Sequence, residues 1–365
     1  MSNLDTGSAE LVNGEGSLPA VCKTVLAVDA MGGDFGPSVV VPGALDAARE
    51  LNAKVLLVGI REKVEETVAA YGDCTDLDYE IVPASQTIEM TDKPGDALRG
   101  KKDSSLHVAC RLVKEGRAKA VISAGNSGAC VACGMFILGR LPYVERPALA
   151  TFLPTEDKPA MLLDVGANVD CKAYQIFQFG LMGSTFFKNY FGFAESPRLG
   201  LLSIGEEEGK GNQAVKEAYS LLKQARSLNF VGNVEGRDLF AGKVQVIACD
   251  GFVGNVALKV SEGLAGSLFR IIKKELSGAG PLTKFGAMLS KGALRNVAKA
   301  VDASEYGGAP LLGLRNLFIV CHGASDSKAI TSACSMAARY VGLNIQDKLA
   351  HAIAVNDELI LAQTL

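Results

Sequence analysis

The chain of 365 residues contains no tryptophan, and aromatic residues make up only 6% of it. Hydrophobic residues still reach 48%, so we expect an interior built from small and aliphatic side chains, as in α/β proteins. A chain of this length can bury one large core or two lobes. The net charge is only −3, so no general attraction to nucleic acid is predicted.

Also missing is any apolar run of about 18 residues, the length needed to cross a membrane. Residues 1–22 show neither the basic n-region nor the apolar core of a signal peptide. Their Gly, Ser and acidic residues predict a disordered tail. The nine cysteines are scattered and odd in number, which favours reduced thiols and a cytoplasmic location.

The motifs of covalent and cofactor-dependent enzymes are absent or incomplete. There is no G-x-S-x-G motif, and Cys130-x-x-Cys133 lacks the second pair of a zinc site. Cys321 and His322 are adjacent on a predicted strand, so their side chains point to opposite faces and cannot easily share a proton. Gly209–Ala214 matches the dinucleotide fingerprint, but three glutamates precede it and would repel a pyrophosphate. We therefore predict no covalent nucleophile, no cofactor and no metal.

What the sequence does contain is a repeated strand–turn–helix pattern. Val25–Pro37 (V-L-A-V-D-A-M-G-G-D-F-G-P) joins an apolar run, an acid, paired glycines and a proline that opens a helix. Similar apolar runs end in small polar loops at 121–128, 162–170, 201–212, 247–255 and 319–328. Strands that alternate with helices predict an α/β fold, with a mostly parallel sheet and helices on both faces. We expect one catalytic domain at 23–365, in one or two lobes, with a site assembled from these strand ends.

The loops at the strand ends have the composition of an anion site. Gly, Asn and Ser before a helix leave backbone N–H groups free for an oxyanion, and Lys210 adds positive charge. The residues predicted to bind phosphate or substrate are Gly125, Asn126, Ser127, Asp164, Gly166, Asn168, Gly211, Asn212, Gly254, Asp29 and Asp34. Asp29 and Asp34 would repel a phosphate dianion, so we expect them to orient groups or handle protons. The predicted catalytic residues are Lys210, Asn255, His322, Ser325 and Asp326.

The same loops carry, in order, the motifs V-D-A-M-G-G-D-F-G-P, I-S-A-G-N-S-G-A, D-V-G-A-N-V-D, S-I-G-E-E-E-G-K-G-N, D-G-F-V-G-N and H-G-A-S-D-S-K-A. Between about Lys23 and about Val341, the chain thereby resembles the phosphate acyltransferases of bacterial phospholipid synthesis, the PlsX family. It departs from the family pattern at Ser127, where threonine is common.

The resemblance implies an enzyme that converts acyl-acyl carrier protein and inorganic phosphate to acyl-phosphate and free acyl carrier protein. It also implies a homodimer with a fold similar to isocitrate and isopropylmalate dehydrogenases and to phosphate acetyltransferase. The implied location is the inner face of the plasma membrane, as a peripheral protein beside the downstream glycerol-3-phosphate acyltransferase. Because phosphate can attack a thioester directly, the missing nucleophile agrees with this activity.

Within that reaction we assign the phosphate to Ser127, Lys210 and the neighbouring backbone. Asn168 and Asn255 would act as orienting donors. His322, with the Ser325 hydroxyl and the Asp326 carboxylate close by in sequence, would serve the leaving thiol or the oxyanion.

Residues 276–301 contain no acidic residue. Helical periodicity places basic side chains on one face and apolar ones on the other, and Gly286 and Gly292 are predicted to break the segment into two short helices. The candidate contact residues are Leu282, Phe285, Leu289, Lys284, Lys291 and Arg295. This basic amphipathic hairpin could lie on an anionic membrane, which we favour, receive the acidic carrier protein, or pack on a dimer partner.

Two other functions stay open at this point. A metal-dependent decarboxylating dehydrogenase of the same general fold could use Asp164, Asp170 and Asp250 as metal ligands, although we find no nicotinamide site and no arginine cluster for a polyacid. A non-catalytic scaffold that recruits lipid enzymes to the membrane would leave the polar strand-end loops unexplained.

Overall fold

The computed structural model describes residues 23–155, 158–300 and 307–356, so the tail predicted at 1–22 lies outside the described residues. The chain forms one sheet of eleven strands. The strands on one side of the sheet are parallel to one another and follow the spatial order β3 (Tyr79–Pro83), β2 (Lys54–Gly59), β1 (Val25–Asp29), β4 (Ala120–Ser123) and β11 (Leu317–Val320). The strands on the other side are likewise parallel, in the order β6 (Ala160–Leu163), β9 (Val246–Ala248), β7 (Arg198–Leu202) and β8 (Asn229–Val234).

Two strands, β10 (Ala309–Leu312) and β5 (Ala148–Leu153), join these parallel groups. β10 is antiparallel to both β11 and β5, and β5 is antiparallel to β6. The two parallel groups therefore run in opposite directions. As a result their carboxyl ends lie at opposite edges of the sheet, which decides where the strand-end loops meet.

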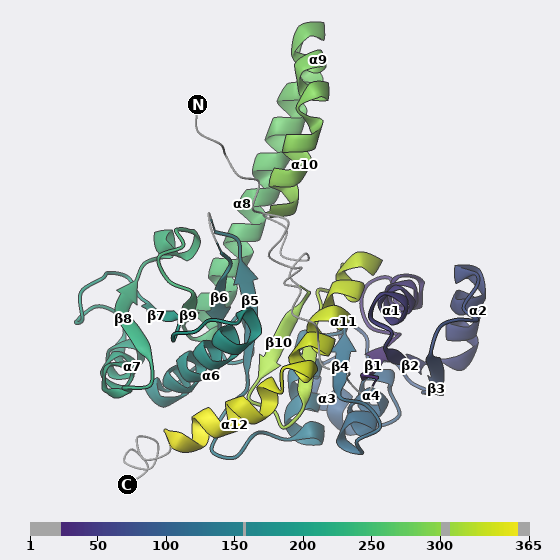
Figure 1. Ribbon diagram of the computed structural model, residues 1–365, viewed down its shortest axis with the longest axis horizontal. Helices are drawn as coiled ribbons and strands as arrows, with labels where there is room; N and C mark the ends of the chain where they lie inside the picture. Colours follow the sequence, from purple (N-terminus) through teal and green to yellow (C-terminus); the bar gives the residue numbers. More distant parts are fainter. Residues whose placement is uncertain (1–22, 156–157, 301–306, 357–365) are drawn as a thin grey trace.

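Helices cover both faces of the sheet (Figure 1). Because side chains along a strand alternate between faces, Leu26 and Val28 pack under one helical layer and Ala27 under the other. The first layer contains α1 (Pro37–Leu51), α2 (Arg61–Tyr71), α6 (Ala173–Phe191), α7 (Gln213–Gln224), α11 (Ser327–Gly342) and α12 (Ile345–Val355). The second contains α3 (Pro94–Gly100), α4 (Ser105–Lys114), α5 (Ser127–Cys133), the π-helix η1 (Gly134–Leu138), the 3-10 helix η2 (Gly236–Phe240) and the base of α8 (Gly251–Gly278).

Aromatic side chains gather where α6 packs between the two halves of the sheet. The Phe186 ring lies 5.1 Å from that of Tyr190, within α6, and 5.8 Å from that of Tyr340 on α11. Since α11 covers β4 and β11 while α6 covers β6 and β9, this contact ties the two halves into one body.

The helix α8 leaves this body as a single helix of 28 residues. With α9 (Pro281–Leu289) and α10 (Lys291–Ala300) it forms the hairpin that projects at the top of Figure 1. The predicted pair of short helices is present, but the break between them falls at Ser290, while Gly286 lies inside α9 and Gly292 inside α10. None of the helices in the described ranges combines the length and hydrophobicity needed to span a bilayer.

Candidate active site

The predicted site residues fall into two clusters at opposite edges of the sheet. The first, which we call the Asp29 cluster, follows β1, β4 and β11 and contains Asp29, Asp34, Gly125, Asn126, Ser127, His322, Ser325 and Asp326. The second, the Asp164 cluster, follows β6, β7 and β9 and contains Asp164, Gly166, Asn168, Lys210, Gly211, Asn212, Gly254 and Asn255. The prediction of a single site from all these strand ends is therefore wrong within one chain, because the strand direction reverses between the two groups. Ser127 and Lys210, which we assigned to the same phosphate, lie in different clusters.

A buried carboxyl group lies at the centre of the Asp29 cluster. Asp29 is only 3% exposed. Its Oδ2 accepts a hydrogen bond from Ser123 Oγ at 2.7 Å, and its Oδ1 accepts one from the Met31 N–H at 3.3 Å. Desolvation raises the pKa of Asp29 above its ordinary value, and these hydrogen bonds oppose that rise only in part.

The glycine loops around Asp29 approach each other closely. The Gly125 N–H donates to Ser123 Oγ at 3.1 Å, so this backbone donor, predicted for phosphate, is already used. A Cβ on Gly32 would lie 2.8 Å from the Gly125 nitrogen and 3.0 Å from Asp29 Oδ2. Only glycine fits there, which explains part of the glycine pair in the opening motif.

The Asn126 side chain is also fully engaged. Its Oδ1 caps α5 by accepting from the Ala129 N–H at 3.0 Å, and its Nδ2 donates to the carbonyl oxygens of Met90 and Asp92 at 2.8 and 3.1 Å. Asn126 therefore fixes the loop before α3 rather than offering a free donor. Ser127, next in the chain, is exposed, and its hydroxyl makes no hydrogen bond within the described part of the chain.

The loop after β11 brings His322 to the same edge. His322 is exposed, and its Nδ1 accepts a hydrogen bond from the Ala324 N–H at 3.1 Å, so in the neutral ring the proton is on Nε2. Asp326 caps α11 by accepting from the Ala329 N–H at 2.8 Å. The Asp34 N–H donates to the Gly323 carbonyl at 2.8 Å, which joins this loop to the one after β1.

The second buried carboxyl group, Asp164, is completely inaccessible to solvent. Its Oδ1 accepts from the backbone N–H groups of Leu149 and Ala167 at 2.9 and 3.1 Å. Its Oδ2 accepts from the backbone and the side-chain amide of Asn168 at 2.7 and 2.9 Å. Burial raises the pKa of Asp164, and these donors lower it in part. With its oxygens taken, Asp164 orders the loop after β6 and cannot contact a substrate.

The first turn of α8 packs directly on that loop. A Cβ on Gly254 would lie 1.8 Å from the Asp164 carbonyl oxygen, and the Gly251 N–H donates to the Asn168 carbonyl at 2.8 Å. Beside this contact, Gly166 adopts a φ of +128° and faces Asn255. Gly254 thus serves close packing and Gly166 a backbone conformation that favours glycine, and Asn255 is left exposed next to them.

The loop after β7 carries a predicted cation, Lys210. Lys210 is exposed and makes no ion pair with another described residue. Gly211 follows with a φ of +101°, and Asn212 caps α7 by accepting from the Val215 N–H at 2.9 Å. Beneath the loop, Ser203 Oγ and Asn233 Oδ1 are buried without a hydrogen-bond partner in the described chain. Lys210, the side-chain amide nitrogen of Asn212 and Asn255 are therefore the exposed donors of this cluster that can reach a substrate.

The carboxylates proposed for a metal in the dehydrogenase alternative do not form a ligand set. The oxygens of Asp164 are occupied as described, and Asp250 caps α8 through the Val253 N–H at 2.9 Å. Within 23–155, 158–300 and 307–356, no group of His, Cys, Asp and Glu has the arrangement of a metal site.

Sequence reasoning missed two residues that shape the site. Ser123 was part of a predicted strand, yet its hydroxyl links Asp29 to Gly125. Met90 lies beside Gly323, where an added Cβ would come 2.9 Å from its Cε. The position of Ser123 at a strand end was a usable signal, whereas nothing in the sequence placed Met90 at this edge.

Comparison with known proteins identifies the family. A family model described as "Fatty acid synthesis protein" matches residues 24–348. The chain is 60% identical to the phosphate acyltransferase of Nitratidesulfovibrio vulgaris over 337 residues, which cover 92% of this chain and 97% of that protein. It is 57% identical to the phosphate acyltransferase of Lawsonia intracellularis, with 92% and 96% covered. The chain belongs to the phosphate acyltransferase family.

Solved structures agree on the fold. The phosphotransacetylase of Streptococcus pyogenes superimposes with a TM-score of 0.61 at 16% identity, covering 87% of this chain and 94% of that one. The EutD phosphotransacetylase of Staphylococcus aureus gives 0.59 at 14% identity, with the same coverage. The predicted fold class, a mostly parallel α/β sheet with helices on both faces, is confirmed. The chain is an acyltransferase with phosphate as acceptor, so the dehydrogenase and scaffold alternatives are set aside.

Proposed function

We propose that the acyl donor is acyl-acyl carrier protein and that phosphate attacks its thioester without a covalent enzyme intermediate. The observation that carries this proposal is the state of the thiols. Burial raises the pKa of Cys321, beside His322, to about 12, and it also raises the pKa values of Cys130 and Cys249. Since only a thiolate is a strong nucleophile, these groups are unsuited to attack.

Phosphate, in contrast, is already an anionic nucleophile. In the proposed step a phosphate oxygen forms a bond to the carbonyl carbon, the carbon–sulfur bond breaks, and the thiolate takes up a proton. The neutral His322 donates a hydrogen bond from Nε2 to the leaving thiolate or to the oxyanion, and the thiolate takes its proton from solvent. Lys210, Asn255 and the Ser127 hydroxyl hold the phosphate, since each is an exposed side-chain donor of one of the two clusters.

The assay for this function measures thiol release from acyl-acyl carrier protein with and without inorganic phosphate, and traps acyl-phosphate with hydroxylamine. We expect release only with phosphate, together with one equivalent of trapped acyl group. Release without phosphate would contradict the proposed reaction.

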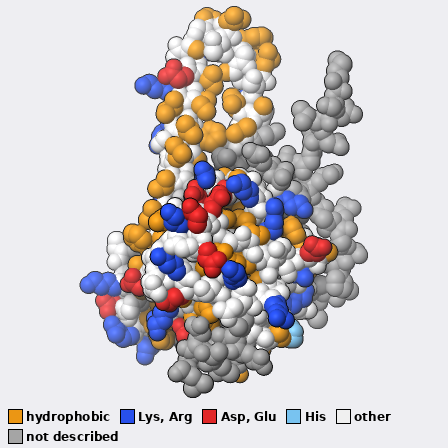
Figure 2. All heavy atoms as spheres, turned by 90° about the vertical axis from the view of Figure 1, so that its left-hand side faces the viewer, with side chains coloured by type: hydrophobic (Ala, Val, Ile, Leu, Met, Phe, Trp, Pro, Cys, Tyr) orange, Lys and Arg blue, Asp and Glu red, His pale blue; other side chains and the backbone are white. Residues whose placement is uncertain are grey.

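A second copy of the chain is proposed to bring the two clusters together. Along α8, exposed apolar side chains recur three or four residues apart: Val253, Val256, Val260, Leu264, Leu268 and Ile271. We call them the α8 stripe. Such spacing is typical of a helix that packs against another helix. Figure 2, which views the molecule from the left of Figure 1, shows hydrophobic side chains along the projecting helices and charged ones mainly over the body.

The position of the α8 stripe supports a composite site. The stripe starts at Val253, next to Asn255 of the Asp164 cluster. The Asp164 cluster packs on the other side of this first turn, at Gly254, so we propose that a copy packed along the stripe reaches this cluster from beside α8 and adds its own Asp29 cluster to it. In a symmetric homodimer this exchange is reciprocal, so two equal sites form.

Mixed dimers test the composite site. Lys210→Ala and His322→Ala copies, each strongly impaired alone, should rise to roughly a quarter of the wild-type activity after random reassociation, because half of the dimers are mixed and hold one intact site. Mixing Lys210→Ala with Asn255→Ala, both in the Asp164 cluster, is the control and should recover nothing. If the mixture of Lys210→Ala and His322→Ala also recovers nothing, the two clusters do not form a shared site across the dimer.

The hairpin tip is proposed to contact an anionic membrane. Leu282, Phe285 and Leu289 of α9 are 84%, 55% and 71% exposed. Lys284 lies among them, Lys291 and Arg295 follow on α10, and no acid occurs between 276 and 301. Apolar side chains flanked by cations favour the surface of an anionic bilayer. We propose that the contact lies on the cytoplasmic face of the membrane, where acyl-phosphate passes to a downstream glycerol-3-phosphate acyltransferase.

Flotation with anionic liposomes tests the membrane contact. Phe285→Asp combined with Leu289→Asp should abolish flotation and leave activity on soluble acyl-acyl carrier protein unchanged. Val231→Asp, at a 49% exposed apolar position on β8, serves as the control and should still float. Undiminished flotation of the double variant would refute the contact.

A further inference from the structure

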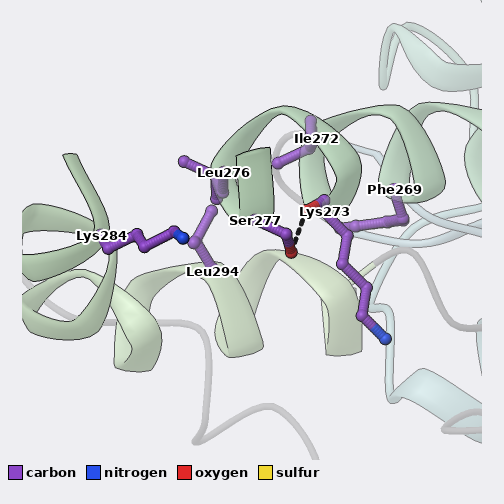
Figure 3. A pocket seen from close by; sticks show the side chains of 8 residues that line it. Phe269, Ile272, Lys273, Leu276, Ser277, Lys284 and Leu294 are labelled. Carbon is purple, nitrogen blue, oxygen red and sulfur yellow. Dashed lines mark hydrogen bonds between the residues drawn. The ribbon is translucent and has the colours of Figure 1, made fainter. Parts of the chain in front are cut away.

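The helices of the hairpin form an open apolar pocket where they meet. The pocket has a volume of about 650 Å³ and is lined by Phe269, Ile272, Lys273, Leu276, Ser277, Lys284, Ala287 and Leu294. This volume falls within the range of about 300–1,000 Å³ typical of small-ligand sites. The Ser277 hydroxyl, one of its few polar groups, already donates to the Lys273 carbonyl at 2.6 Å (Figure 3).

The pocket and the α8 stripe occupy different faces of α8. At 3.6 residues per turn, Phe269, Ile272 and Leu276 lie about a third of a turn away from the stripe. The pocket face continues the side on which α8 packs against the body and meets α9 and α10. A second copy on the stripe therefore leaves the pocket open.

The charge at the pocket is positive. In Figure 3 the Lys284 side chain extends from α9 toward Leu276 and Leu294, and Lys273 stands at the other end and points outward. No ion pair with a described residue neutralises Lys284, and no acid lines the pocket. An apolar hollow with an unpaired ammonium group suits a ligand that joins a hydrocarbon chain to an anionic head.

We propose that this pocket binds the acyl-phosphate that the enzyme produces, with the acyl chain between α8, α9 and α10 and the phosphate at Lys284. Acyl-phosphate is a single-chain anionic amphiphile, so its chemistry matches the lining. The pocket then holds the product after it leaves the site of transfer. The proposal rests on the acyltransferase activity but on neither the membrane contact nor the composite site.

The absence of tryptophan from the chain permits a direct test. Phe269→Trp places the only tryptophan in the pocket, and dodecyl phosphate serves as a stable probe, added below its micelle concentration and without vesicles. We expect a saturable blue shift of emission. Because each buried methylene contributes about 0.8 kcal/mol, affinity should rise about fourfold per methylene from octyl to dodecyl phosphate. Phe136→Trp, at an exposed position on η1, reports on the body and should show no such shift.

Two further variants in the Phe269→Trp background, each paired with a control variant, test which groups of the pocket bind the probe. Lys284→Gln should weaken dodecyl phosphate about tenfold by removing a charge-assisted contact. Lys291→Gln, which removes a charge outside the lining, should change affinity less than about twofold. Ala287→Leu should fill the pocket and abolish saturation, whereas Thr283→Leu, also on α9 but outside the lining, should not. Circular dichroism establishes that each variant is folded.

Three results would overturn the proposal. An equal shift with dodecyltrimethylammonium would mean non-specific apolar binding. An equal effect of Lys284→Gln and Lys291→Gln would mean that the phosphate does not lie at Lys284. A shift that follows protein concentration without any probe would mean that a second copy fills the pocket. Acyl transfer is measured separately with acyl-acyl carrier protein, so loss of the pocket and loss of the activity are distinguishable.

Discussion

Ser123 at the end of β4 donates its hydroxyl proton to Asp29 at the end of β1, with 2.7 Å between Oγ and Oδ2. Ser123→Ala removes this donor and leaves a buried carboxyl group with one hydrogen bond fewer. We expect a loss of about 1–3 kcal/mol in the free energy of unfolding, measured by urea denaturation. Ser220→Ala, at a solvent-facing position of α7, should change it by less than about 0.5 kcal/mol. Equal stabilities of the two variants would contradict a structural role for this pair.

The raised pKa of Asp29 also predicts a pH dependence. Because its pKa is higher in the folded state than the unfolded value of 3.8, Asp29 contributes most to stability below about pH 3.8, and this contribution is lost as the pH rises through the folded-state pKa. Asp29→Asn should therefore flatten the fall in unfolding free energy above pH 3.8, as followed by urea denaturation at several pH values. An identical slope for Asp29→Asn would show that the pKa of this carboxyl group does not differ between the folded and unfolded states.

The contact between Gly254 and Asp164 predicts a large effect of a single methyl group. A Cβ at Gly254 would lie 1.8 Å from the Asp164 carbonyl oxygen, so Gly254→Ala must displace α8 or the loop after β6. We expect a loss of about 1–3 kcal/mol or more in thermal or urea denaturation. Gly263→Ala, in the same helix with open space around it, should instead stabilise the protein by about 1 kcal/mol. The opposite signs of the two changes in unfolding free energy distinguish the steric clash at Gly254 from the intrinsic helix propensity of alanine.

Lys210 predicts a kinetic effect specific to phosphate. Lys210→Ala should lower kcat/KM for phosphate about 10- to 100-fold through the loss of a charge-assisted hydrogen bond. KM for acyl-acyl carrier protein should hardly change. Lys216→Ala is the control: it removes the same charge on the exposed side of α7, outside both clusters, and should leave kcat/KM for phosphate nearly unchanged. Full activity and an unchanged phosphate KM in Lys210→Ala would exclude Lys210 from phosphate binding.

Because the Cys321 thiol beside His322 is buried, we predict that the enzyme stays active when this thiol is removed. Since burial raises the pKa of Cys321 to about 12, its thiol should react slowly with iodoacetamide at pH 8, compared with the thiol in the unfolded chain. Cys321→Ala should keep kcat within about twofold. A loss beyond about 100-fold, with the fold intact, would require a catalytic thiol and contradict direct attack by phosphate.

Local sequence patterns predicted the parts of this protein well and their assembly less well. The apolar run before Asp29 predicted a strand, and the glycines after it predicted a tight turn. Both are present. The single site failed because it depends on strand direction, which β10 and β5 reverse. β10 is the short segment A-P-L-L, and such a segment carries no periodicity from which pairing or polarity can be read. Likewise Asn126 and Asn168 had the composition of anion donors, but only the packed structure shows that their amides are used by neighbouring loops.

The length of α8 has a consequence for the product. Its 28 residues span about 42 Å, and its first turn is fixed on Asp164. An acyl chain reaches about 15 Å, half of the hydrocarbon core of a bilayer. A molecule held among the strand-end loops therefore cannot have its methyl end in the membrane at the same time. Acyl transfer to phosphate and delivery of the acyl-phosphate to the membrane must therefore occur one after the other. The rate of delivery can be changed by shortening or lengthening α8, without changing any residue that takes part in the reaction.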